Sequence, residues 1–275
     1  MLNNSNPSNS IKLIATDLDG TLLTDDKRID PSFWEIFDLL TDQGVLFIAA
    51  SGRQYYKLEE QFERVKDKII FLAENGTFVR YRGEDLFVND LDVESARNFV
   101  RRGREVRDAD IILCGKQSAY IESDYAPFVK DASQYYKRLQ RVDDLCQVDD
   151  SILKVTLWDH KNAETNSYTH FKAFEPDYKV AVAGDVWLDV TGRTASKGTA
   201  IERVQKIFSV GWDQTLIFGD YLNDLDMMGS GWYSYAMKNA HPKILEISRF
   251  TTRHDNNNNG VVDTIRELFG LNGNA

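Results

Sequence analysis

Four apolar segments of this sequence are each followed by small, polar or charged side chains of the kinds that bind and transfer phosphate. Lys197, which is positively charged, stands at the start of the predicted helix that precedes the last of these segments. The residues that follow the segments are Asp17, Asp19, Gly20 and Thr21; Ser51, Gly52 and Arg53; Glu74, Asn75 and Gly76; and Gly219, Asp220, Asn223 and Asp224. No other stretch of the sequence carries such a set, so we expect the chemistry of the protein to lie here.

The charges of these side chains predict a metal ion and a phosphate group. Neighbouring aspartates repel one another and raise each other's pKa unless a cation lies between them. Mg²⁺ binds one or two carboxylates together with waters and substrate phosphate, and we therefore predict Mg²⁺ as the cofactor. Lys197, Ser51 and backbone N–H groups at the glycines would bind the anion. At an effective dielectric near 20, a carboxylate about 3 Å from a phosphate dianion is opposed by roughly 10 kcal/mol, so its attack requires these cations.

The segments before these residues have the pattern of buried parallel strands. Short, almost continuous apolar runs alternate with amphipathic helices, which predicts an α/β fold with a doubly wound parallel sheet. The predicted strands are residues 11–16, 45–50, 69–73, 215–218 and 233–237. One predicted helix begins at Pro31, and the other predicted helices are residues 55–64, 199–208, 224–228 and 261–269. Ligands of such sheets bind at the carboxyl ends of the strands, so the sheet would bring the polar residues together.

Residues 85–186 have a different pattern, with shorter and more polar strands and longer loops, and they predict an inserted α+β domain. Within this segment, apolar and polar residues nearly alternate over residues 152–158, which is the pattern of a half-exposed strand. We therefore expect a catalytic core of residues 1–84 and 187–275 and a cap domain of residues 85–186. The polar residues 1–10 are expected to form a disordered tail.

The composition excludes several classes of protein. The 275 residues carry 33 Lys and Arg against 43 Asp and Glu, and the net charge of −10 argues against nucleic acid and anionic membranes as partners. Two cysteines cannot form a disulfide framework, and residues 1–10 do not have the pattern of a signal peptide. We expect a cytoplasmic protein with a small phosphorylated metabolite as its partner and no obligate protein partner.

Four motifs resemble those of the haloacid-dehalogenase superfamily, in the same order. They are D-L-D-G-T at 17–21, S-G-R at 51–53, S-K-G at 196–198 and G-D-x-x-N-D at 219–224. The insert between the second and third motifs is similar to the large α/β cap of the Cof-type phosphatases, and E-N-G-T at 74–77 and A-M-K-N-A at 236–240 resemble further landmarks of that group. The resemblance implies a Rossmann-like core and a phosphatase.

The resemblance also implies a role for each site residue. Asp17 would be the nucleophile that forms an aspartyl-phosphate, and Asp19 would be the general acid and base. Phosphate would be bound by Ser51, Gly52, Arg53, Asn75, Lys197 and Asn223, of which Ser51 and Lys197 would hold the transferring group. The metal ligands would be Asp17, the backbone carbonyl of Asp19, Asp220 and, through a water, Asp224.

Two positions depart from the family pattern, and other interpretations stay open. Tyr221 replaces a small residue and Lys238 replaces a common glycine; neither removes a catalytic group. Ser51 and Asp224 could be helix N-caps, and Lys197 could be a solvated surface lysine. The enzyme could also pass the phosphoryl group to a second sugar as a mutase or phosphotransferase, or the chain could be a regulatory protein on the same fold.

Overall fold

The computed structural model describes residues 10–271, which form two compact units. The first unit contains residues up to Gly52, Phe62–Leu86 and the chain from Ser196 onward; the second contains Arg53–Gln61 and Phe87–Ala195. Ser10 is the one residue of the predicted disordered tail that is described, and the rest of that tail lies outside the described residues. No helix of the described chain is both long enough and apolar enough to cross a membrane.

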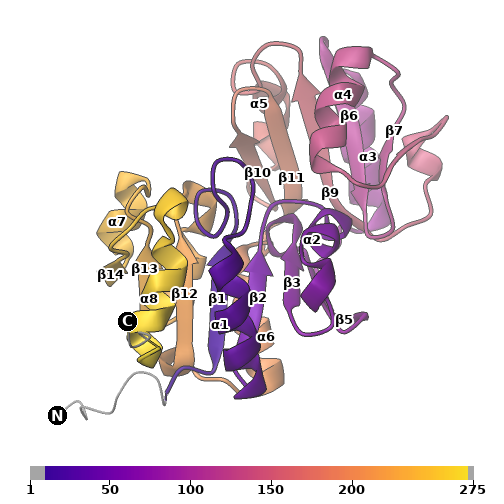
Figure 1. Cartoon of the computed structure of the whole chain (residues 1–275). Coiled ribbons are helices and arrows are strands. Elements are labelled where there is room, and N and C mark those ends of the chain that lie inside the picture. Colours follow the sequence, from indigo (N-terminus) through magenta and orange to yellow (C-terminus); the bar gives the residue numbers. More distant parts are fainter. Residues whose placement is uncertain (1–9, 272–275) are drawn as a thin grey trace. The chain divides into compact units, whose positions relative to one another are not determined.

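The first unit is built on an eight-stranded sheet with the order β14-β13-β12-β1-β2-β3-β4-β5 among the described residues (Figure 1). The strands from β14 to β3 are parallel, and β4 pairs antiparallel with β3. The strands are β1 (Leu13–Asp17), β2 (Leu46–Ala50), β3 (Ile70–Ala73), β4 (Phe78–Tyr81), β5 (Glu84–Val88), β12 (Thr215–Gly219), β13 (Tyr233–Ala236) and β14 (Phe250–Thr251).

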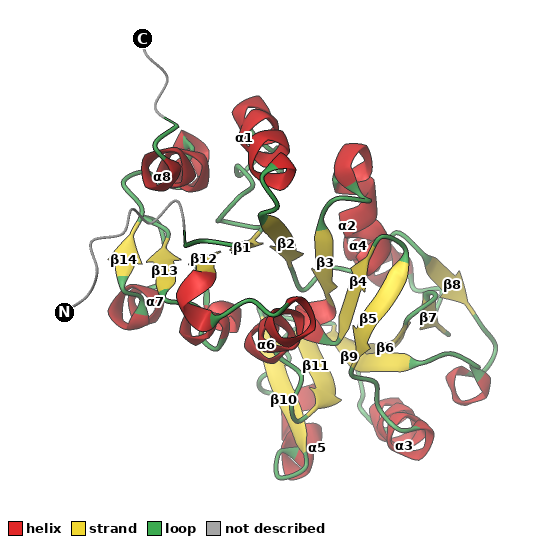
Figure 2. Ribbon diagram, turned by 90° about the horizontal axis from the view of Figure 1, so that it is seen from below, coloured by secondary structure: helices red, strands yellow, loops and turns green. Residues whose placement is uncertain are grey.

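Helices cover both faces of this sheet, as the predicted doubly wound fold requires. Figure 2 shows α1 (Pro31–Asp42) and α8 (Gly260–Phe269) on one face and α6 (Lys197–Phe208) and α7 (Pro242–Ile247) on the other. Because both faces are covered, β1 and β12 are buried along their whole length. The predicted helix at 224–228 is replaced by two short 3₁₀ turns, Leu222–Asp224 and Met227–Ser230. The predicted fold class is confirmed.

The second unit contains a six-stranded sheet with the order β10-β11-β9-β6-β7-β8. The strands are β6 (Ala109–Gly115), β7 (Ala119–Ile121), β8 (Leu139–Arg141), β9 (Ile152–Asp159), β10 (Tyr178–Ala183) and β11 (Trp187–Gly192), and the helices are α2 (Tyr55–Gln61), α3 (Val93–Arg104), α4 (Ala126–Tyr135) and α5 (Ser167–Phe171). Side chains from α3 and α5 pack against one face, where Phe99 and Phe171 are buried. Phe128 of α4 packs against the other face.

Two expectations for this part of the chain differ from the structure. Strand β9 is almost fully buried rather than half-exposed, because it lies between β6 and β11 and its sheet is packed on both faces. Strand β11 pairs antiparallel with β9 and β10, so residues 187–192 lie in the second unit and not in the predicted core. The 53–61 segment also belongs to the second unit by its contacts. Strand pairing depends on distant residues, and the sequence of a single strand does not reveal it.

Candidate active site

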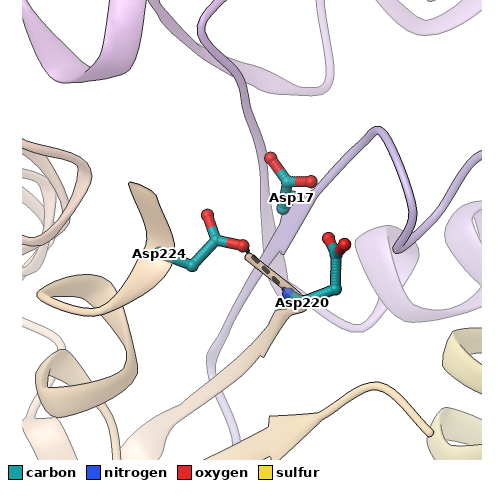
Figure 3. Close-up of side chains that lie close together, drawn as sticks. All are labelled: Asp17, Asp220 and Asp224. Carbon is teal, nitrogen blue, oxygen red and sulfur yellow. Dashed lines mark hydrogen bonds between the residues drawn. The ribbon is translucent and has the colours of Figure 1, made fainter. Parts of the chain in front are cut away.

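The ends of β1 and β12 place three carboxylates close together. Asp17 is the last residue of β1, and Asp220 and Asp224 follow β12, which pairs in parallel with β1. One carboxylate oxygen from each of the three residues lies within 4.8 Å of the others. Figure 3 shows the three side chains gathered around one point. Asp17 and Asp224 are buried and Asp220 is partly buried, so their charges are poorly screened by solvent.

Lys197, at the start of α6, is fully buried between two of these carboxylates. Its Nζ lies 2.5 Å from Oδ1 of Asp17 and 2.6 Å from Oδ1 of Asp224. Burial lowers the pKa of Lys197, but the attraction of the two carboxylates outweighs it and raises the pKa above its usual value. Ser196 caps α6 by accepting a hydrogen bond from the backbone N–H of Thr199. This cap fixes where the helix begins and makes Lys197 its first residue. A solvated surface lysine is therefore excluded.

Asp224 also shapes the loop that carries Asp220. Its Oδ2 accepts hydrogen bonds from the backbone N–H groups of Asp220, at 2.9 Å, and Tyr221, at 3.2 Å. Asp224 is therefore not the N-cap of this 3₁₀ turn, which is Tyr221; its carboxylate accepts a hydrogen bond from the backbone of that N-cap residue. The same carboxylate accepts from Lys197 through its other oxygen. One side chain thereby connects the loop, the lysine and the carboxylate cluster.

The carboxylate of Asp220 is held from the other side by the loop after β1. Thr21 donates a hydrogen bond from Oγ1 to Oδ1 of Asp220 at 2.7 Å. Gly20 has a φ of +79°, and a Cβ at this position would lie 2.4 Å from Oδ2 of Asp220. A side chain at position 20 would therefore occupy the space that the carboxylate needs. Thr21 was noted in the sequence among the residues after the first strand but was not assigned to the site.

Two of the clustered carboxylates hold their protons more tightly than usual. Burial raises the pKa of Asp17 well above its ordinary value, the nearby Lys197 opposes this, and the charges of Asp224 and Asp220 add to it. Burial likewise raises the pKa of Asp220 to about 6, against the opposing hydrogen bond from Thr21. A cation among these oxygens would remove the repulsion, and hard carboxylate oxygens are ligands that Mg²⁺ accepts. The donor set fits a divalent cation.

The ends of β2, β3 and β12 place four further predicted residues beside one another. The backbone N–H of Asn75 donates to the carbonyl of Ser51 at 3.0 Å. A Cβ on Gly52 would lie 3.0 Å from Nδ2 of Asn75, and Asn223 donates from Nδ2 to Oδ1 of Asn75 at 3.4 Å. Asn75 has a φ of 53°, a conformation that asparagine tolerates better than most residues. These contacts bring Ser51, Gly52, Asn75 and Asn223 together.

Two predicted site residues form hydrogen bonds with residues outside this group. The carboxylate of Asp19 is partly exposed and accepts a hydrogen bond at 2.8 Å from Lys27, whose φ is 61°. Arg53 lies in the second unit, where its Nη1 donates to Oε1 of Gln61 at 3.2 Å. Sequence reasoning missed Lys27; its signal was a cation eight residues after Asp19 in the loop that follows the first motif.

The comparison with protein families identifies the chain. A model of the haloacid dehalogenase-like hydrolases matches residues 14–265. The chain belongs to this family. The Cof-type resemblance of the sequence and the prediction of a phosphatase of this superfamily are confirmed.

Relatives of this haloacid dehalogenase-like hydrolase are similar over nearly their whole length. A 5-amino-6-(5-phospho-D-ribitylamino)uracil phosphatase of Escherichia coli, YbjI, is 32% identical over 265 residues, which cover 94% of this chain and 97% of YbjI. A crystal structure from Eubacterium rectale superposes with a TM-score of 0.86 at 29% identity, covering 94% of this chain and 99% of that one. The sugar phosphatase BT4131, at 18% identity and a TM-score of 0.78, shares the fold and covers 94% of this chain and 99% of its own.

Proposed function

We propose that this hydrolase uses Mg²⁺ to hydrolyse a small phosphomonoester, a sugar phosphate or a similar metabolite, through an aspartyl-phosphate on Asp17. The observation that carries the proposal is the buried group of Asp17, Asp220 and Asp224 with Lys197 between two of them. Lys197, together with a divalent cation bound by these carboxylates, would supply the positive charge that a phosphate dianion next to a carboxylate nucleophile requires. Family membership supports the same chemistry.

Asp17 would attack phosphorus while Asp19 moves the protons. A carboxylate oxygen of Asp17 forms a bond to phosphorus as the P–O bond to the leaving alcohol breaks, and Asp19 donates a proton to that alcohol. Water then attacks phosphorus, Asp19 accepts its proton, and the bond to Asp17 breaks to release phosphate. The partly exposed position of Asp19 supports this role, because protons can exchange there with solvent. Lys27 would hold the Asp19 carboxylate in place through its hydrogen bond.

The phosphoryl group would be held by residues from the ends of β2 and β3 and from α6. Ser51 and Lys197 would donate to the oxygens that carry charge in the transition state. Gly52, Arg53, Asn75 and Asn223 would bind the remaining oxygens, and the hydrogen bond between the amides of Asn223 and Asn75 supports a shared role for these two. Asp17, the backbone carbonyl of Asp19, Asp220 and Asp224 would hold Mg²⁺. When bound, the ion would neutralise phosphate charge and lower the repulsion between the anion and Asp17.

The substrate would be a phosphorylated sugar or sugar alcohol. The name of YbjI describes a phosphate ester on a ribityl chain, and that of BT4131 a sugar phosphatase. Both names combine a phosphomonoester with a polyhydroxylated carbon chain. We assign the selection among such molecules to the second unit, and the compartment to the cytoplasm, where such metabolites are made.

A phosphate-release screen tests this function. The full-length protein is incubated with some tens of phosphorylated sugars, sugar alcohols and nucleotides, including 5-amino-6-(5-phospho-D-ribitylamino)uracil, with Mg²⁺ and with a chelator. We expect Mg²⁺-dependent release from a subset of the sugar and sugar-alcohol phosphates. The absence of release from every phosphomonoester in Mg²⁺, by folded protein, would overturn the proposal. Addition of an acceptor sugar separates a phosphatase from a phosphotransferase, since a phosphatase yields free phosphate alone.

A further inference from the structure

The second unit contains an open groove of about 800 Å³ that none of the proposed active-site residues lines. All of its lining residues belong to the second unit, where they lie on α2, β7, α4 and β8 or in the loops beside them. A volume of this size accommodates a small organic molecule. The groove is therefore a candidate for a second binding site.

Part of the groove lining is apolar. Four residues of α4 lie on the helix face that lines it, spaced at i, i+3, i+4 and i+7: Ala126, Val129, Lys130 and Ser133. Next to this face, β7 contributes Ile121 and β8 contributes Leu139, and Tyr136 lines the groove from the loop between α4 and β8. Ile121 is 3% exposed and Tyr136 is 6% exposed. A ligand with an apolar ring would cover this part of the lining.

The charged side chains of the groove are mostly positive, although the whole chain carries a net charge of −10. Four cations and two carboxylates give the groove a net charge of +2: Lys57, Lys130, Lys137 and Arg141 against Glu60 and Asp124. Lys130 is exposed, and no residue in the described part of the chain forms an ion pair with it. The groove therefore has positive charge available for an anion.

The other three cations form ion pairs that a bound anion can replace. Nζ of Lys57 lies 3.5 Å from Oε2 of Glu60, and Lys137 pairs with Oε1 of the same carboxylate, so one negative charge is shared by two lysines. Nη2 of Arg141 lies 3.4 Å from Oδ2 of Asp124, and both side chains are more than half exposed. Exposed ion pairs contribute little to stability, so phosphate oxygens can take the place of these carboxylates at a small cost.

We propose that this groove binds a small organic anion that joins an apolar ring to at least two negative charges, as a nucleoside diphosphate does. The ring would pack against Val129, Leu139 and Tyr136, and the phosphates would bind Lys130 and Arg141. In a chain with an excess of acidic residues, a locally positive groove is where a polyanion associates. An uncharged sugar would gain nothing from the cations, and inorganic phosphate would leave the apolar lining uncovered. The inference goes beyond the proposed function, because no residue of the groove takes part in hydrolysis.

A pair of double variants tests the groove in the full-length protein. Binding of adenosine 5′-diphosphate (ADP) is measured by isothermal titration calorimetry in a chelator, so that Mg²⁺-dependent hydrolysis does not interfere. Lys130→Ala with Arg141→Ala removes two cations of the groove. Arg101→Ala with Lys161→Ala is the matched control, since it removes two exposed cations of the same unit that do not line the groove. We expect the Kd for ADP to rise about tenfold in the groove variant and less than about twofold in the control.

Each result of this titration decides the inference. If ADP does not bind the wild-type protein at concentrations up to about 1 mM, the inference is overturned. If the groove variant and the control bind ADP equally well, ADP binds elsewhere, for instance at the catalytic site, and the inference is overturned as well. Lys130→Ala alone guards against a double variant that fails to fold, because Lys130 is exposed and has no ion pair to lose. For this variant we expect a rise of about threefold.

Two partial ligands test whether both the ring and the charges are needed. Adenosine lacks the phosphates and inorganic pyrophosphate lacks the ring, so both should bind the wild-type protein more weakly than ADP does, by about tenfold or more. Pyrophosphate that binds as tightly as ADP would contradict a role for the apolar lining, and adenosine that binds as tightly would contradict a role for the cations.

Hydrogen exchange locates the bound molecule without turnover. We expect ADP to slow amide exchange in peptides from residues 121–141 of the wild-type protein. Slower exchange only in peptides of the first unit would place ADP at the catalytic site and overturn the inference. If the protein hydrolyses no phosphomonoester, the proposed function fails, yet this experiment still decides whether the groove binds the anion.

Discussion

Nζ of Lys197 lies 2.5 Å from Oδ1 of Asp17, and both side chains are buried. The same Nζ lies 2.6 Å from Oδ1 of Asp224, so one ammonium forms ion pairs with two buried carboxylates. A third carboxylate, that of Asp220, completes the cluster. The lysine therefore supports both the folded state and the charge balance of the site, and the two contributions can be measured separately.

Replacement of Lys197 by methionine removes the cation and leaves two buried carboxylates unpaired. Breaking a buried pair in this way costs about 3–5 kcal/mol, so we expect Lys197→Met to lower the free energy of unfolding by about that amount in urea denaturation. Lys206→Met, an exposed position on the same helix, should change it by less than about 1 kcal/mol. Saturating Mg²⁺ should recover part of the loss. Equal effects at the two positions would show that the buried ion pairs do not stabilise the fold.

The raised pKa of Asp220 predicts how stability changes with pH. The pKa is about 6 in the folded protein against an ordinary value of 3.8, so between these values the native state binds more protons than the unfolded state. The contribution of the Asp220 carboxyl group to the free energy of unfolding therefore falls as pH rises through that window. Above the window, its full destabilising effect is present. In a chelator, the free energy of unfolding of wild type relative to Asp220→Asn should fall between about pH 4 and pH 6.5.

The same titration predicts the pH dependence of metal binding. Protons and the cation compete for the Asp220 carboxylate, so the increase in melting temperature caused by Mg²⁺ should be larger at about pH 7.5 than at about pH 5. Asp220→Asn should remove most of this difference. A wild-type increase that is the same at both pH values would contradict the assignment of Asp220 as a ligand.

Gly20→Ala should disturb the site because its new Cβ collides with the carboxylate of Asp220. Gly44→Ala is the matched control, because its new Cβ meets no other atom. The new Cβ would lie 2.4 Å from Oδ2 of Asp220, and Gly20 has a φ of +79°. Gly44 has a similar φ of +84°, but no atom lies within 4 Å of its added Cβ. Both variants should lose about 1 kcal/mol of stability from the backbone conformation. Gly20→Ala alone should also raise the Mg²⁺ concentration for half-maximal activity, by about tenfold or more.

If the two glycine variants need the same Mg²⁺ concentration for half-maximal activity, the close approach of Gly20 to Asp220 does not affect Mg²⁺ binding. A titration of activity against Mg²⁺, with melting temperatures measured on the same samples, separates this outcome from general destabilisation.

Removal of the proposed general acid should depend on the leaving group. Asp19→Asn should slow hydrolysis of an alkyl phosphate by about 10²–10⁴-fold, because the alkoxide then leaves without a proton. With 4-nitrophenyl phosphate, whose leaving group needs little protonation, the loss in kcat/KM should be smaller. Equal losses for both substrates would contradict proton donation by Asp19. Lys27→Met, which removes the hydrogen bond to this carboxylate, should show a weaker form of the same pattern.

The sequence predicted the site residues whose positions follow from the order of strands, helices and polar residues along the chain. Asp17, Ser51, Asn75 and Asp220 each stand at or just after the end of a strand, and parallel strands end at the same edge, so their convergence could be predicted from the apolar pattern alone. The helix predicted at residues 199–208 was also readable, and in the structure it begins two residues earlier, at Lys197. The complete burial of Lys197 was not, because a lysine in the first turn of a helix is ordinarily solvated.

Features that depend on distant pairing could not be predicted. Strand β11 belongs to the second unit because of its pairing with β9 and β10, and nothing in its own residues indicates that. The side chain of Gln54 forms hydrogen bonds with the backbone of Arg138, 84 positions away, so the identity of residue 138 carries no signal. Lys27, which donates the hydrogen bond to Asp19, has a left-handed backbone conformation that a lysine in a sequence rarely indicates.

Chemical trapping at position 17 tests the central proposal most directly. The protein is mixed with a phosphomonoester that it hydrolyses and Mg²⁺, quenched in acid during turnover, and treated with borohydride, which reduces an acyl phosphate to an alcohol. Peptide mass spectrometry should then find homoserine in place of Asp17, in the presence of substrate and not in its absence. Sustained turnover with an unmodified Asp17, or turnover by Asp17→Asn at a rate near that of the wild-type protein, would contradict a covalent intermediate on this residue.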